Sequence, residues 1–128
     1  MQTILLLALA GALGTLARWG LSMLVSSLIP GGFPWGIFVT NVIGCFLFGM
    51  VWALCGIHHV LNDAARLILL TGFMGAFTTF STLIFDTQSM LSAGQTAACL
   101  INLCGQIILG LFALWLGIQM VEKLAAAF

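Results

Sequence analysis

Residues 71–82 carry the polar groups that are best placed, by type and spacing, to bind ions. They are Thr-Gly-Phe-Met-Gly-Ala-Phe-Thr-Thr-Phe-Ser-Thr, with two glycines and five hydroxyl residues, within a long apolar stretch. Glycines and adjacent β-branched threonines weaken a helix. A break here would free backbone carbonyl oxygens to hold a cation, and hydroxyls to line an ion path. The alternative is a continuous helix whose Ser and Thr side chains hydrogen-bond to the preceding turn.

Small and polar residues recur at helical spacing in three other apolar stretches. Such residues let membrane helices approach closely, and polar side chains in membranes turn toward protein rather than lipid. Packing explains the glycines and alanines but not Arg18, Asn41, Asn102 and Gln106. The predicted protein-facing stripes are Ala10, Gly14 and Arg18; Asn41, Gly44, Cys45, Phe48 and Trp52; and Asn102, Gly105, Gln106, Leu109, Gly110, Ala113 and Gly117.

Arg18 lies well inside the first apolar stretch. Burying it costs about 2.5–3.5 kcal/mol, so we expect a partner or an aqueous vestibule, unless the side chain reaches the headgroups. No Cys/His or carboxylate cluster has the spacing of metal ligands, and a Ser-His-Asp set would need a histidine within the membrane. We therefore do not expect an enzyme.

These residues must be positioned by membrane-spanning helices. Of the 128 residues, 62% are hydrophobic and 5% charged, with a formal net charge of zero and a mean hydropathy of +1.25. Soluble domains carry about 25% charged residues, so soluble enzymes are excluded. Three cations cannot form a basic patch for nucleic acid. Because a spanning helix needs about 20 apolar residues, we predict an all-α membrane protein with one four-helix domain in a lipid bilayer.

The predicted spans cover residues 4–28, 35–56, 67–91 and 96–121. A breaker at 30–34, a polar connection containing His58 and His59, and a turn at 92–95 separate them. No cation precedes the first span, so we expect a permanent helix rather than a cleaved signal peptide. Both termini then share one side with Arg66 and Lys123. Two cations specify the orientation only weakly.

Three elements together resemble the fluoride channels of the CrcB/Fluc family: Arg18, the Asn41-Val42-Ile43-Gly44 segment and the 71–82 string. The resemblance extends over essentially the whole chain. It implies a passive channel that exports fluoride across the inner (plasma) membrane of a prokaryote. It also implies an antiparallel, dual-topology homodimer with two pores and a structural sodium ion at its centre, held by the carbonyls of Gly75 and Thr78.

The same resemblance assigns pore residues. Asn41 would donate to fluoride, and Phe80 would turn its positive ring edge to the anion. Ser81 and Thr82 match a track of hydroxyls, and Arg18 matches the vestibule arginine. Gln106 stands where the family has a serine, and it would offer a longer amide donor.

Other departures affect the same region. Leu83 replaces the expected second pore phenylalanine, Ala76 replaces the second glycine of a pair, and Gly110 stands at a hydroxyl position. These changes leave open a non-standard pore or a paralogous partner subunit. Two further alternatives are a small multidrug-resistance-like proton-coupled exporter, in which Asp86 would be the membrane carboxylate, and a non-conducting membrane subunit that needs a partner chain.

Overall fold

The computed structural model describes residues 1–57 and 61–127, and their regular secondary structure is helical throughout. His58 and His59 lie outside the described residues. Four stretches of the described chain are long and apolar enough to cross a membrane: Gln2–Leu28, Trp35–Cys55, Asp63–Ser92 and Thr96–Ala126. The prediction of an all-α protein with four membrane-length helices is confirmed. The elements are α1 (Gln2–Leu28), α2 (Trp35–Trp52), the π-helix η1 (Ala53–Ile57), α3 (Asp63–Arg66), the π-helix η2 (Leu67–Met74), α4 (Gly75–Phe77), α5 (Phe80–Ser92) and α6 (Thr96–Ala126).

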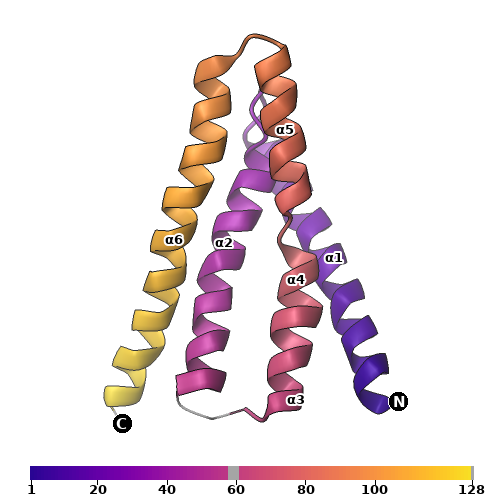
Figure 1. The fold of residues 1–128 in the computed structure, drawn as a ribbon, viewed down its shortest axis with the longest axis vertical. Coiled ribbons are helices and arrows are strands. Elements are labelled where there is room, and N and C mark those ends of the chain that lie inside the picture. The colour runs from indigo at the N-terminus through magenta and orange to yellow at the C-terminus, as the bar shows by residue number, and fades with distance from the viewer. Residues whose placement is uncertain (58–60, 128) are drawn as a thin grey trace.

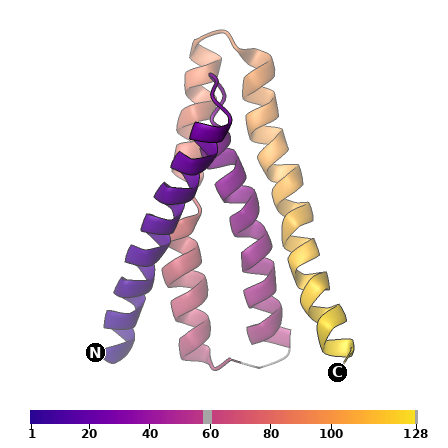
Figure 2. The same cartoon turned by 180° about the vertical axis from the view of Figure 1, so that it is seen from behind.

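The spans alternate in direction, so both termini lie at the same end of the bundle as α3 (Figures 1 and 2). The connections at 29–34 and 93–95 lie at the opposite end. Helix α2 packs between α1 and α6, while α5 packs on α6 and the first half of the third span packs on α1. Residues of α2, the third span and α6 therefore meet in the middle of the bundle.

The third span is broken in its middle. Helix α4 ends at Phe77, and Thr78 (φ −88°, ψ 158°) and Thr79 (φ −148°, ψ 111°) are extended before α5 begins at Phe80. Thr78 Oγ1 donates to Met74 O at 3.1 Å, which is the back-bonding of the continuous-helix alternative, but the bond sits in the last turn of α4. The predicted break is confirmed and the continuous helix is wrong.

The largest differences between the helix bounds and the sequence expectation lie at two places. The third span begins at Asp63 rather than Leu67, because the Asn62 side chain accepts a hydrogen bond from Ala65 N at 2.9 Å and caps the helix. An asparagine in this position satisfies one of the free N–H groups at a helix start. Helix α6 extends to Ala126, five residues beyond the predicted end, through the good helix formers Leu124 and Ala125. The π-helical turns of η1 and η2 were not expected.

Glycines set how closely the spans approach. A Cβ on Gly49 would collide with the Leu114 carbonyl, and one on Gly117 would collide with the Phe46 carbonyl, so α2 and α6 pack backbone to backbone. A Cβ on Gly44 would collide with the Thr78 methyl group. This last contact seats the break directly against α2.

The residues of the predicted protein-facing stripes are buried or half-buried except at two positions. Ala10, Gly14, Gly44, Asn102, Gln106, Gly110, Ala113 and Gly117 are buried. Leu109 is 45% exposed, because it lies to one side of the buried line that Gln106 and Gly110 follow on α6. Trp52, the last residue of α2, is 39% exposed, and the Arg66 guanidinium lies 4.5 Å from the centroid of its ring.

Candidate functional site

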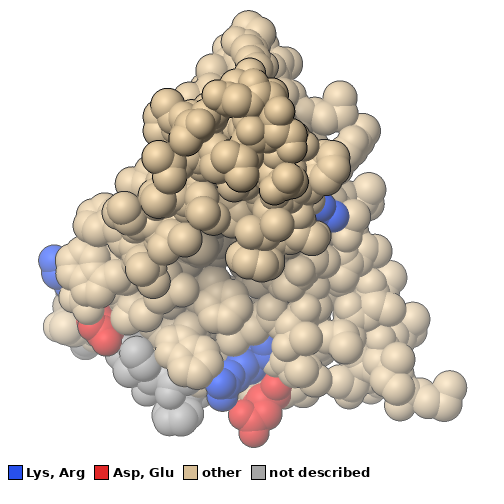
Figure 3. Space-filling model, turned by 45° about the horizontal axis from the view of Figure 1, so that its top comes forward, with Lys and Arg blue, Asp and Glu red and all other residues tan. Residues whose placement is uncertain are grey.

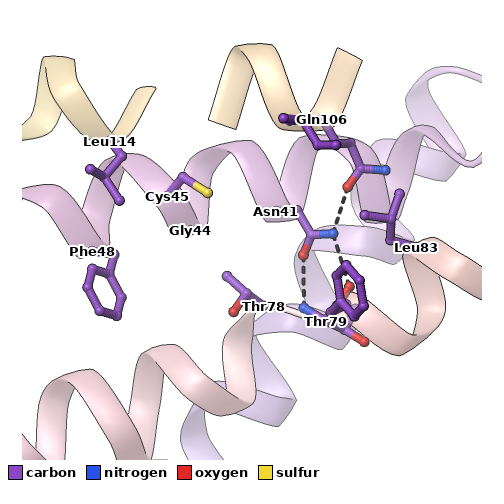
Figure 4. A pocket seen from close by; sticks show the side chains of 11 residues that line it. Asn41, Gly44, Cys45, Phe48, Thr78, Thr79, Leu83, Gln106 and Leu114 are labelled. Atoms are coloured by element: carbon purple, nitrogen blue, oxygen red, sulfur yellow. Dashed lines mark hydrogen bonds between the residues drawn. The ribbon is translucent and has the colours of Figure 1, made fainter. Parts of the chain in front are cut away.

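A pocket of ≈ 350 Å³ lies where α2, the break, α5 and α6 meet (Figure 4). Four of the site residues assigned from the sequence, Asn41, Thr78, Phe80 and Gln106, line it. The remaining lining residues are Gly44, Cys45, Phe48, Thr79, Leu83, Ile107 and Leu114. A second pocket of ≈ 280 Å³ shares Phe48 and Leu114 with the first and extends along α2 and α6 to Trp52.

Asn41 ties α2 to the break. Its Oδ1 accepts from Thr79 N at 2.9 Å, and its Nδ2 donates to Thr79 O at 3.2 Å and to Gln106 Oε1 at 2.7 Å. A carboxamide has two N–H donors, so both donors of Asn41 are engaged. In the single chain, Asn41 therefore holds the extended backbone in place and has no N–H left for an anion.

Gln106 continues this network into α6. Its Nε2 donates to Asn102 Oδ1 at 2.8 Å, Asn102 Nδ2 donates to Thr87 Oγ1 at 2.9 Å, and Thr87 Oγ1 donates to Leu83 O at 2.7 Å. Asn102 is 0% exposed and Gln106 is 6% exposed. We call this chain of hydrogen bonds, from Thr87 through Asn102 and Gln106 to Asn41, the amide relay. Buried polar groups in membranes need such partners because no water is at hand to replace them.

Hydroxyl groups cluster just after the break. Thr79 Oγ1 lies 2.9 Å from Thr82 Oγ1 and 3.5 Å from Ser81 Oγ. Ser81 is exposed and Thr82 half-buried, and neither is among the described residues that line the pocket. The structure thus gathers the predicted hydroxyls beside the pocket, on the first turn of α5.

The two pore positions on α5 differ sharply in exposure. Phe80 is 74% exposed at the edge of the pocket, whereas Leu83 is 6% exposed and forms part of its wall. Leucine offers an alkyl surface where the family resemblance expects a ring edge. Phe80 is thus the one phenylalanine of the described α5 residues that lines the pocket.

The break also frees the two carbonyls expected to hold a cation. In a continuing helix the Thr79 and Thr82 N–H groups would donate to Gly75 O and Thr78 O. Here Thr79 N donates to Asn41 Oδ1 and Thr82 N donates to Thr79 Oγ1 at 3.4 Å. Carbonyl oxygens without their helical donors suit a hard cation, and Gly75 is exposed in the single chain. No group of His, Cys, Asp or Glu among the described residues has the arrangement of a metal site.

Arg18 lies apart from the pocket. It is half-buried on α1, and its Nε is buried without a hydrogen-bond partner among the described residues. The predicted protein partner for Arg18 is thus not found at that atom.

Charged side chains are few and scattered on the face shown in Figure 3, with positive and negative groups side by side near one end. The pocket is therefore lined by amides, hydroxyls and apolar groups rather than by charges.

Comparison with known proteins identifies the family. Residues 5–118 match the family described as CrcB-like protein, Camphor Resistance (CrcB). The chain belongs to the CrcB family. The resemblance expected from Arg18, Asn41-Val42-Ile43-Gly44 and the 71–82 string is confirmed.

Relatives of this CrcB-family chain are named "Fluoride-specific ion channel FluC". That of Nitratidesulfovibrio vulgaris (strain DSM 19637 / Miyazaki F) is 52% identical over 118 residues, 92% of this chain and 95% of the relative. That of Solidesulfovibrio magneticus is 52% identical over 114 residues, 89% and 91% of the two chains. That of one Thermus thermophilus strain is 41% identical over 120 residues, 94% and 95% of the two chains.

Proposed function

We propose that this chain forms a passive, fluoride-selective channel that lowers the cytoplasmic fluoride concentration by exporting the ion. One observation carries the proposal: a mainly apolar pocket that includes the amides of Asn41 and Gln106 and the threonines of the break lies at a broken span, in a CrcB-family chain 52% identical to a protein named fluoride-specific ion channel FluC. Fluoride is small and strongly hydrated, so a pore must replace its water with fixed N–H and O–H donors. A channel of this kind is a transport protein and not an enzyme.

The proposed pore uses the residues gathered at the break. Gln106 keeps one N–H that the amide relay does not engage, and the Ser81 and Thr82 hydroxyls lie beside the pocket. Phe80 would turn a ring edge to the anion while excluding water. Asn41 could donate to fluoride only after Gln106 Oε1 or Thr79 O is displaced. Arg18 would raise the anion concentration at the mouth of the pore.

The assembly we propose is an antiparallel dimer of two copies with a pore on each side of the interface. Phe80, assigned to the pore, is 74% exposed in the single chain, and a second copy would cover it. Arg66 and Lys123 give the end with the termini only two cations, which supports insertion in both orientations. The four membrane-length helices and the prokaryotic relatives support residence in the inner (plasma) membrane of a prokaryote.

A structural sodium ion would sit between the two copies. The carbonyls of Gly75 and Thr78 from each copy would hold it, because their usual helical donors are engaged by Asn41 and Thr79. Bound sodium would link the two breaks and supply a fixed positive charge near the anion path. The proposed sodium site is supported by the two carbonyl oxygens at the break that lack their helical N–H donors.

Ion efflux from liposomes tests the proposal. Reconstituted protein should release fluoride rapidly when the potential is clamped by valinomycin, while a chloride electrode records no release above protein-free vesicles. Fluoride efflux that requires a proton gradient would instead indicate a coupled exporter. If a monodisperse, correctly folded preparation released no fluoride, the channel assignment would be wrong and a non-conducting subunit would be the better description.

A further inference from the structure

The amide relay has only one consistent direction. Thr87 Oγ1 gives its single hydrogen to Leu83 O, so the same oxygen can only accept from Asn102. This turns the Asn102 carbonyl toward Gln106 and the Gln106 carbonyl toward Asn41. At the other end, the Thr79 N–H and C=O fix which side of the Asn41 carboxamide faces the break. Both ends of the relay are thus set by backbone groups, which cannot exchange donor for acceptor.

The direction determines what the pocket presents to an anion. Asn41 engages Gln106 Oε1 and Asn102 engages one Nε2 hydrogen, so the second Nε2 hydrogen of Gln106, a residue that lines the pocket, has no partner among the described residues. With the amide reversed, a carbonyl oxygen would take the place of this N–H and would repel an anion. Gln106 is therefore held from two sides: Asn41 engages its oxygen, and Asn102, itself held by Thr87, engages one of its N–H groups.

We infer that Thr87 and Asn102 are positioning residues of the anion path: together with Asn41 they hold the Gln106 carboxamide with its oxygen on Asn41 and its free N–H available to the anion. This inference rests on the proposed function. Asn102 is fully buried and neither residue lines the pocket, so both act through Gln106 rather than by contact with the ion. The relay joins α5 and α6 to the break, so it also couples the far half of the bundle to the anion path.

Thr87→Val tests the role of the hydroxyl at nearly constant shape. It removes the oxygen that Asn102 Nδ2 donates to, so Asn102 loses its partner on α5 and holds Gln106 less firmly, while Asn41 still engages Gln106 Oε1. We expect the fluoride concentration for half-maximal efflux to rise about 3- to 10-fold, the loss expected for one hydrogen bond. Thr87→Ser keeps the hydroxyl and should bring the half-saturating concentration back to the wild-type value.

Ser89→Ala is the matched control. Ser89 Oγ donates to Phe85 O at 2.9 Å on the same helix, as Thr87 does to Leu83 O, but Ser89 is exposed and outside the relay. This variant should conduct like wild type. A purely structural role of Thr87 would reduce the amount of active protein and hence the maximal rate, and would leave the half-saturating concentration unchanged.

The wild-type protein separates the two claims. Absence of fluoride efflux from wild type would overturn the proposed function itself. If wild type conducts but Thr87→Val keeps its half-saturating concentration within about 2-fold, well below the change expected for one hydrogen bond, the positioning role is wrong. Thr87→Ala, compared with Thr87→Ser, provides a second arm should Thr87→Val fail to fold. Alanine also removes the oxygen that Asn102 Nδ2 donates to, so it should raise the half-saturating concentration as Thr87→Val does. Equal half-saturating concentrations in Thr87→Ala and Thr87→Ser would contradict the inference.

Discussion

Asn41 and Thr79 exchange two hydrogen bonds, N–H to Oδ1 at 2.9 Å and Nδ2 to C=O at 3.2 Å, between the second and third spans. A side-chain amide here replaces the backbone partners that a continuous helix would supply. Backbone groups inside a membrane need such partners, because unsatisfied ones cost several kcal/mol there. Asn41 thus supplies the hydrogen-bond partners that stabilise Thr79 at the break.

Asn41→Ala should disrupt the break as well as the ion path. The Thr79 N–H and C=O lose their partners, and Gln106 loses a donor, so we expect destabilisation of about 1–3 kcal/mol and loss of fluoride efflux. Thermal unfolding in detergent and liposome efflux measure the two effects. Asn41→Asp retains the acceptor for Thr79 N but places a carboxylate oxygen against Thr79 O and Gln106 Oε1, so its thermal stability should be no higher than that of Asn41→Ala.

Gly44→Ala should separate α2 from the break. The added methyl group would overlap the Thr78 methyl, so the segment must move, at a cost of about 1–3 kcal/mol. We expect strongly reduced efflux. Gly20→Ala on α1 is the matched control, since a Cβ there has no neighbour within 4 Å. It should conduct normally and gain up to about 1 kcal/mol from helix propensity. Equal efflux from both variants would show that the close approach of Gly44 is unimportant for conduction.

Most of the architecture could be predicted from the sequence because it depends on local properties. Long apolar runs specify membrane helices, and the glycine and threonine content of residues 71–82 weakens the third one at the place where it breaks. The start of the third span at Asp63 was predicted wrongly, since the cap formed by Asn62 was not recognised. The π-helical turns η1 and η2 have no sequence signal that we can identify.

The hydrogen-bond partners at the site depend on tertiary geometry. Asn41 and Gln106 lie 65 residues apart, and the direction of their bond follows from the rotation of α2 and α6 about their axes. The family resemblance therefore assigned both residues as anion donors, but it did not predict that Asn41 is engaged by Thr79 and Gln106. The contact between Thr87 and Asn102 could have been predicted from the spacing of the two residues in the sequence. The two residues are nearly equidistant from the tight turn at 93–95, so an antiparallel helical hairpin brings them face to face.

Phe80→Leu should reduce fluoride efflux while the protein remains folded. Leucine keeps apolar bulk at the edge of the pocket but has no positive ring edge. Loss of about 1.4 kcal/mol of stabilisation would slow permeation about tenfold. Phe112→Leu is the control, since Phe112 is also exposed, at 56%, but lies on α6 and does not line the pocket. If Phe112→Leu slowed efflux as much as Phe80→Leu, the effect would come from general packing.

The charge balance at the two ends makes dual topology testable. Arg66 and Lys123 lie toward the end with the termini, and the loop at 29–34 carries no cation. A carboxy-terminal tag should therefore be detected on both sides of the membrane. Ala125→Lys with Ala126→Lys adds two cations at the exposed end of α6, which should hold the termini in the cytoplasm. This variant should lose efflux when expressed alone, because every copy then has the same orientation.

An oppositely biased partner should restore conduction. Gly31→Lys and Gly32→Lys place cations in the other connection, where an added side chain has no neighbour within 4 Å. Combined with Arg66→Gln and Lys123→Gln, they should invert the chain. Each biased variant alone is expected to be silent, whereas co-expression should return fluoride efflux toward wild type, since only the mixture supplies both orientations. Full efflux from one biased variant with a single tag orientation would show that the working assembly is parallel or monomeric.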